Sequence, residues 1–208
     1  MSISVHRFLF LLSSTRRLGN SEQLAYCAAH PLPPTYEQQW VHLQDYPLPE
    51  FTDLRHNASF PQPFGNAKIL LDATLKATDI VLVTPLYLYN MPAQAKHYLD
   101  HWNAWLRIPS LNFRDEMRDK TLWSIVVSSS GKFEAQPLQD TLTLTAQYMR
   151  MDWGGMLYGT GSRPNDIQED ETALRLAKSF FGEPRPTVEL TAPHAPRANR
   201  LQKGLKGH

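Results

Sequence analysis

Residues 6–21, HRFLFLLSSTRRLGNS, hold the pattern that decides the fold. A continuous apolar run ends at Leu12, a polar loop follows, and a helical pattern then runs from about Ser21 to Ala29. An apolar run without alternation is typical of a strand that is buried on both faces, as strands are in a parallel sheet. The stretch therefore predicts a strand, a loop and a helix at the start of an α/β domain.

The alternation of strand and helix signals continues along the chain. Further strands are predicted at residues 40–43, 79–84, 121–127 and 155–158, and further helices at residues 67–77, 92–106, 138–149 and 169–181. Parallel strands need crossover helices that bury their apolar stripes on the sheet, so the pattern predicts a three-layer α/β sandwich with a five-stranded parallel sheet. Ligands of such folds bind at the carboxyl ends of the strands, beside the point where strand order reverses. The loops after the first, third and fourth strands are therefore the expected place for function.

Composition and charge limit the classes of function. The chain has 208 residues, a formal net charge of +1 and a single cysteine. Near neutrality argues against a nucleic-acid coat, and one thiol excludes an internal disulfide or a site built from several thiolates. No apolar run approaches the roughly 20 residues of a membrane-spanning helix, so we expect a cytoplasmic protein without membrane or nucleic-acid partners. One domain is expected over residues 1–190, followed by a basic and mobile tail at residues 191–208.

The loop after the first strand has the residues of an anion site. It joins hydroxyl groups, an arginine and a glycine directly before a helix begins, and the candidate ligands are Ser13, Ser14, Arg16, Asn20 and Ser21. Free amides at a helix N-terminus favour a phosphate, hydroxyls donate to its oxygens, and a guanidinium can pair with it. The alternative is that Asn20 or Ser21 only caps the helix. The motif GxxxxGK[ST] is absent from the sequence, which excludes the usual nucleoside-triphosphate loop.

The loop after the third strand is apolar and aromatic, whereas surface loops are normally polar. It consists of Pro85, Leu86, Tyr87, Leu88, Tyr89 and Asn90. Such a loop suits a flat apolar ligand or a partner subunit. The alternative is that these side chains fold back onto the core.

Three loops together resemble those of the flavodoxin-like NAD(P)H-dependent oxidoreductases, which include FMN reductases and quinone reductases. Residues 13–21 resemble the FMN phosphate loop, and residues 84–93, with Lys96 and Asp100 after them, resemble the loop and helix that hold the isoalloxazine ring. The loop after the fourth strand stands where the family closes on the other edge of the ring, and it consists of Ser128, Ser129, Ser130 and Gly131. The resemblance implies a flavodoxin-like sheet with the strand order 2-1-3-4-5.

The resemblance also implies a function. Bound FMN would take hydride from NADPH or NADH and pass electrons to a quinone, a nitro or azo compound, or free flavin. No side chain is then needed as a catalytic acid or base, and the amides of residues 129–131 are candidates to stabilise the reduced ring. The helix at residues 92–106 commonly lies near a dimer interface in this family, so a homodimer is expected. His97, Asp100 and His101 lack HExxH spacing, and we predict no metal there.

Two other classes stay open on the sequence. A flavodoxin-type electron carrier exchanges electrons with protein partners, but such carriers are typically acidic, whereas this chain is near neutral. A flavin-free binding module of the same fold is the third class. The intact Arg16 and the pair Asn20 and Ser21 argue against it.

Overall fold

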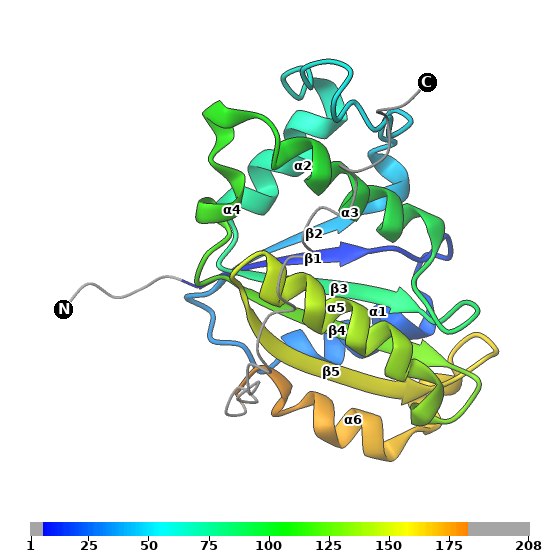
Figure 1. Cartoon of the computed structure of the whole chain (residues 1–208). Coiled ribbons are helices and arrows are strands. Elements are labelled where there is room, and N and C mark those ends of the chain that lie inside the picture. Colours follow the sequence, from blue (N-terminus) through cyan, green and yellow to red (C-terminus); the bar gives the residue numbers. More distant parts are fainter. Residues whose placement is uncertain (1–5, 183–208) are drawn as a thin grey trace, which may run out of the picture.

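A computed structural model describes residues 6–182, so the predicted tail at residues 191–208 lies outside the described residues. Five parallel strands form one sheet in the order β2-β1-β3-β4-β5 (Figure 1). The strands are β1 (Arg7–Leu12), β2 (Glu37–His42), β3 (Asp79–Pro85), β4 (Thr121–Ser128) and β5 (Asp152–Thr160). The predicted α/β class, the five parallel strands and their order are thus confirmed.

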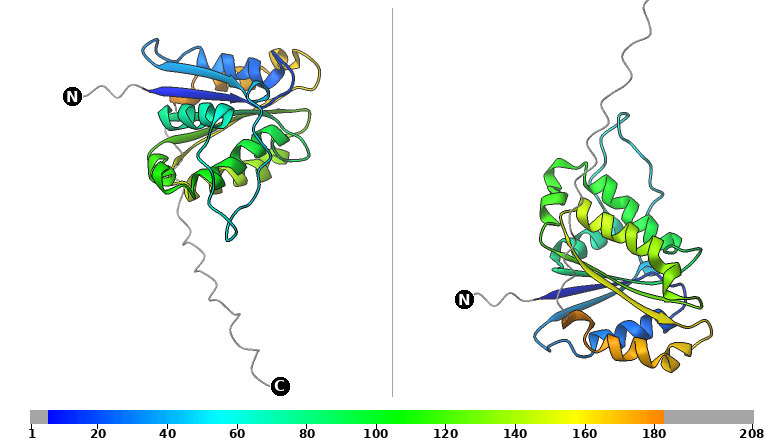
Figure 2. Two further views of the ribbon diagram at one scale, coloured as in Figure 1. Left: turned by 90° about the horizontal axis from the view of Figure 1, so that it is seen from above. Right: turned by 60° about the horizontal axis from the view of Figure 1, so that its bottom comes forward.

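Helices cover both faces of the sheet (Figures 1 and 2). One face carries α1 (Asn20–Ala29) and α6 (Glu171–Ala177), and the other carries α2 (Gly65–Lys76), α3 (Ala93–Trp105), the short α4 (Phe113–Glu116) and α5 (Gln136–Tyr148). Short 3-10 turns complete the described part, namely η1 (Leu43–Asp45), η2 (Pro109–Leu111), η3 (Lys132–Ala135), η4 (Asp166–Glu169) and η5 (Phe180–Gly182).

Two hydrophobic cores follow from this arrangement. Phe8 and Phe10 of β1 pack under α1, whereas Leu9 and Leu11 belong to the core under α2, α3 and α5. Successive strand residues point to opposite faces, so a sheet covered on both sides needs apolar residues at every position. This is the reason for the uninterrupted apolar runs in the sequence. No helix in the described residues 6–182 is long and apolar enough to cross a membrane.

Two predicted strands are longer in the structure. β2 begins at Glu37, before the predicted start at Trp40, because the first residues of this edge strand are exposed and polar and give no apolar signal. β5 spans Asp152–Thr160 in place of residues 155–158. Its Gly154 lies against Trp123, where a Cβ atom would approach ring atom Cδ2 to 2.2 Å, so only glycine allows this close approach.

The last predicted helix, residues 169–181, is shorter in the structure. The regular helix α6 spans Glu171–Ala177 only, and 3-10 turns flank it. Asp170 sets its start, because the Asp170 carboxylate accepts a hydrogen bond from the amide of Ala173 and thereby caps the helix.

Candidate functional site at the carboxyl edge of the sheet

The loops after β1, β3 and β4 begin side by side, because these strands are neighbours in the sheet. The amide of Ser13 donates to Val83 O of β3 at 2.9 Å, and the amide of Leu86 donates to Val127 O of β4 at 3.1 Å. The loop after β1 therefore begins beside β3, and the loop after β3 begins beside β4. The strand order reverses between β1 and β3, since β2 lies on the far side of β1. This is the position at which doubly wound sheets bind their ligands.

The loop after β1 presents an uncapped helix and an exposed arginine. Gly19 is the N-cap of α1, and no side chain caps that helix, so neither Asn20 nor Ser21 has the capping role considered as the alternative. Arg17 pairs with Asp45 of η1, whereas Arg16 is exposed. The Ser14 hydroxyl accepts from the amide of Arg16 at 3.1 Å and turns the loop there. Free amides, the positive end of the helix dipole and a guanidinium together favour an anion.

Three other candidate residues of this loop are either buried or bound to protein groups. The Ser13 side chain is buried, and its hydroxyl donates to Val83 O at 3.1 Å. Ser21 is also buried. Asn20 donates from Nδ2 to Arg163 O at 2.9 Å and so ties the loop to the segment after β5. Gly161 of that segment lies so close that a Cβ atom would be 2.9 Å from Asn20 Nδ2. The Asn20 side chain therefore positions the loop by binding protein groups.

The loop after β3 is a tight turn in an unusual conformation. Tyr87 and Asn90 exchange two backbone hydrogen bonds, of 2.8 Å and 3.1 Å. Leu88 has φ 48° and Tyr89 has φ 65°, as in a type I′ turn, where Asn and Gly are the preferred residues. Leu88 is 93% exposed, and Tyr87 and Tyr89 are also exposed. These three side chains do not fold back onto the core, although Leu86 packs against it.

Strained backbone conformations of this kind cluster at active sites and ligand-binding sites. The turn places apolar side chains in solvent, next to the start of the anion-type loop. The Asn90 carboxamide accepts from the amide of Met91 at 2.8 Å and fixes the exit of the turn. Pro85 is the last residue of β3 and sets the entrance. The loop is therefore an exposed apolar turn at the carboxyl edge, closed by its own hydrogen bonds.

The loop after β4 is held by hydrogen bonds between two hydroxyl groups and the backbone of Ser130. Ser128 Oγ lies 3.0 Å from Tyr158 Oη and accepts from the amide of Ser130 at 3.0 Å, while the Tyr158 hydroxyl donates to Ser130 O. The Ser130 amide is therefore already engaged, which leaves the amides of Ser129 and Gly131 as the candidate donors to a ligand. Phe133 follows and is 87% exposed.

Sequence reasoning missed two features near these loops. Phe133 lies two residues after Gly131, and an isolated exposed aromatic residue gives no periodic signal. Glu22 is buried behind the loop after β1, where it contacts Leu18, Tyr26 and His42. An acidic residue in the first turn of a helix usually indicates only a favourable dipole interaction, so the sequence carried no sign of this cluster.

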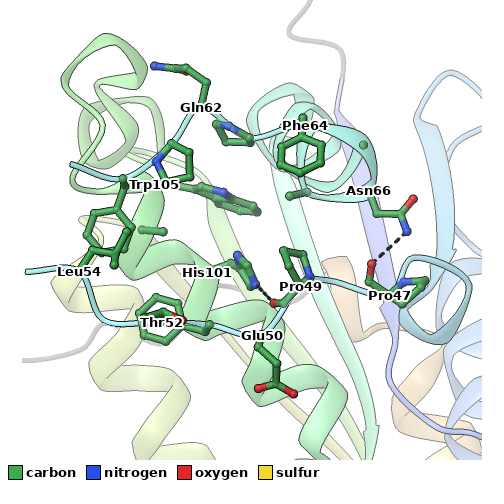
Figure 3. Close-up of a pocket in the computed structure, with 17 residues that line it drawn as sticks. Pro47, Pro49, Glu50, Thr52, Leu54, Gln62, Phe64, Asn66, His101 and Trp105 are labelled. Atoms are coloured by element: carbon green, nitrogen blue, oxygen red, sulfur yellow. Dashed lines mark hydrogen bonds between the residues drawn. The ribbon is translucent and has the colours of Figure 1, made fainter. Parts of the chain in front are cut away.

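A separate cavity of about 580 Å³ lies under residues 47–64, between α2 and α3 (Figure 3). Its lining is mainly apolar and includes Phe51, Phe64 and Trp105. Its polar side chains hold the covering segment itself, as in the bonds from Asn66 Nδ2 to Pro47 O at 3.0 Å and from His101 Nε2 to Pro49 O at 2.9 Å. None of the residues that line this cavity belongs to the loops after β1, β3 and β4.

Two histidines of α3, His97 and His101, contact the segment of residues 47–64 that covers the cavity. The Nε2 atoms of His97 and His101 both lie 2.9 Å from Pro49 O. Burial lowers the pKa of His101. Lys96 pairs with Asp100 along the helix. Within residues 6–182, no three His, Cys, Asp or Glu side chains are grouped closely enough to hold a metal ion.

A doubly wound parallel sheet with an anion-type loop after β1 and an exposed aromatic turn after β3 defines a flavodoxin-like protein of the flavin-binding kind. Residues 6–152 match the profile of the family described as NADPH-dependent FMN reductase. The chain therefore belongs to the NADPH-dependent FMN reductase family. The predicted cofactor, FMN, and the predicted class of enzyme, an NAD(P)H-dependent oxidoreductase, are confirmed by this membership.

Individual relatives agree with the family. YwqN of Bacillus subtilis (strain 168), provisionally named an NAD(P)H-dependent FMN-containing oxidoreductase, is 29% identical over 170 residues, which are 80% of this chain and 92% of YwqN. The solved structure of Trp repressor binding protein from Bacillus subtilis has a TM-score of 0.67 and 25% identity, covering 84% of this chain and 97% of that one. The NAD(P)H:quinone oxidoreductase of Methanothermobacter marburgensis shares the fold, with a TM-score of 0.64, 14% identity and coverage of 92% and 99%.

Proposed function

We propose that FMN binds at the carboxyl edge between β1, β3 and β4, and that the enzyme transfers reducing equivalents from NADPH or NADH to a small-molecule acceptor. The acceptor classes are a quinone, a nitro or azo compound, or free flavin. The observation that carries the proposal is the exposed type I′ turn at Tyr87–Asn90, beside an uncapped helix. One feature suits a flat apolar ring, and the other suits a phosphate.

The residues present fit the parts of FMN. The amides at the start of α1, the Arg16 guanidinium and the Ser14 hydroxyl would hold the phosphate. The apolar turn after β3 would cover the ring, with the amides of Ser129 and Gly131 on the other side. Each group is on a rigid support, since β1, β3 and β4 are buried along their length. Pre-set donors stabilise developing charge without reorganisation.

Bound FMN supplies the redox chemistry, in which hydride from the nicotinamide is taken up and electrons are passed on. The protein's own task is to bind the two ring systems against each other and to exclude water. Tyr87 and Tyr89 are more than half exposed, at 53% and 55%, so they are free to line the face on which nucleotide and acceptor bind in turn. The chemistry of the site requires no acidic or basic side chain.

We also propose that the protein is a homodimer through the face formed by α3 and α5. These helices follow the neighbouring strands β3 and β4 and cover the same side of the sheet (Figure 2). On α5, Leu144 and Tyr148 are exposed, at 64% and 56%. Light scattering at micromolar concentration should give twice the chain mass, and a monomeric mass would contradict this assignment.

An absorbance spectrum of the protein with FMN tests the function. We expect bound-flavin bands that bleach on anaerobic addition of NADPH or NADH and return when a quinone is added. Bands that persist with both nucleotides would indicate an electron carrier, and absence of bound flavin would indicate a binding module. The double variant Ser14→Ala/Arg16→Ala serves as a matched control, because at the same FMN concentration it should bind less flavin than the wild type and keep the fold.

A further inference from the structure

A buried carboxylate lies directly behind the loop after β1. Glu22 is 3% exposed, and its two oxygens have different partners. Oε2 accepts from the amide of Leu18 at 2.6 Å, whereas Oε1 lies 3.1 Å from Tyr26 Oη and 3.3 Å from His42 Nε2. One side chain thus links the loop, helix α1 and strand β2.

The loop residue bound by Glu22 has an unusual backbone. Leu18 has φ 52°, a left-handed conformation that leucine rarely adopts. Its side chain is 66% exposed, so packing does not hold it there. Hydrogen bonds do, because the Glu22 carboxylate accepts from its amide and Gln23 Nε2 donates to its carbonyl oxygen at 2.8 Å. Both polar groups of the Leu18 backbone are therefore clamped by the first turn of α1.

The clamp is anchored on the sheet. His42 is the last residue of β2 and is paired in register with Leu12, the residue that precedes the loop. Burial, and then the neighbouring Glu22 carboxylate, raises the pKa of Tyr26, so Tyr26 remains a hydroxyl donor. Arg17 and Asp45 give a second link between the loop and the segment after β2.

A carboxylate in the first turn of α1 repels a phosphate at the same helix end, and its burial adds a desolvation cost. Electrostatics alone would disfavour an acid here, whereas the hydrogen bond to Leu18 gives it a geometric role. We propose that Glu22 is a positioning residue for the flavin phosphate, which holds Leu18 in the left-handed conformation so that Arg16 and the first amides of α1 face one anion. This inference rests on the proposed FMN site.

The test compares FMN with riboflavin, which lacks the phosphate, by quenching of flavin fluorescence on titration with the protein. We expect Glu22→Ala to weaken FMN binding at least about tenfold and riboflavin binding less than about threefold. Glu22→Gln keeps an oxygen that can accept from Leu18, so it should stay within about threefold of the wild type for both ligands. Glu171→Ala removes an exposed acid from the first turn of α6 and should change neither affinity.

A second readout needs no flavin. In the ligand-free protein, hydrogen exchange at the Leu18 amide should quicken in Glu22→Ala and stay slow in Glu22→Gln. If Glu22→Ala does not fold by circular dichroism, Gln23→Ala removes the other half of the clamp and should lower the preference for FMN over riboflavin.

Three outcomes would overturn the inference. They are an unchanged FMN affinity in Glu22→Ala, an equal loss of FMN and riboflavin affinity in that variant, and a Glu22→Gln variant that binds FMN as weakly as Glu22→Ala. If the wild type itself shows no preference for FMN over riboflavin, the proposed phosphate site is wrong, and a Leu18 clamp seen by exchange would then be structural only.

Discussion

Substitutions that relieve the backbone strain in the turn after β3 should raise the stability of the protein and weaken its binding of flavin. Leu88 and Tyr89 occupy left-handed backbone positions that an Asn-Gly pair fills without strain. The double variant Leu88→Asn/Tyr89→Gly should therefore unfold at a higher temperature than the wild type. The same variant should bind FMN more weakly, because it removes the apolar cover that we assign to the ring.

The size of the effect follows from the geometry. A left-handed residue other than glycine or asparagine costs about 1 kcal/mol, so replacing both Leu88 and Tyr89 recovers about 2 kcal/mol. Against this stands lost burial, which is nearly zero for Leu88 at 93% exposure and about 1 kcal/mol for the half-exposed Tyr89. The net gain is about 1 kcal/mol in the free energy of unfolding. For a chain of this size it corresponds to about 2–4 °C in Tm.

The assay is unfolding of the ligand-free protein by heat and by urea, paired with FMN titration. Ile69→Asn is the matched control, since Ile69 is exposed at 47% within helix α2, away from the turn and from the proposed dimer face, and Asn there should destabilise by about 1 kcal/mol and leave FMN binding unchanged. A turn variant that is less stable than the wild type would refute the strain argument. A more stable variant with unchanged FMN affinity would refute the role of these side chains as ring cover.

Three further predictions concern the phosphate loop, the opposite end of the sheet and pH. Ser14→Ala/Arg16→Ala should weaken FMN binding about tenfold to a hundredfold and leave riboflavin binding and the circular dichroism spectrum unchanged. Asp79→Ala should lower the free energy of unfolding by about 3 kcal/mol in urea titration, because the buried Asp79 carboxylate accepts from Trp123 Nε1 at 3.0 Å, and FMN binding per folded molecule should not change. Folding lowers the pKa of His101, so the unfolded chain binds more protons than the folded chain at pH values between the two pKa values. The contribution of neutral His101 to the free energy of unfolding is therefore fully present above the unfolded pKa of about 6.5. It should be lost as the pH falls through that value towards the folded pKa, as measured by urea unfolding at a series of pH values. The loss should be smaller in His101→Gln, and an unchanged pH profile would contradict it.

The alternation of buried strands and crossover helices was readable from the sequence. A strand covered on both faces needs apolar residues at every position, so β1, β3 and β4 appear as unbroken apolar runs. The positions of the site loops followed from the same pattern, because the carboxyl ends of parallel strands share one edge. The edge strand β2 was predicted too short, since half of its residues are polar and exposed.

Only the tertiary structure decided what the individual loop residues contact. Asn20 has the residue type of a phosphate ligand, yet its side chain binds Arg163 O, 143 residues away in sequence. Glu22 appears in the sequence as an ordinary first-turn acid, and only the packing of β2 against α1 brings His42 to it. Local sequence determines secondary structure and the order of the loops through periodicity and conformational preference. The partner of each polar group depends on which segments the folded chain brings together, and that is a property of the whole fold.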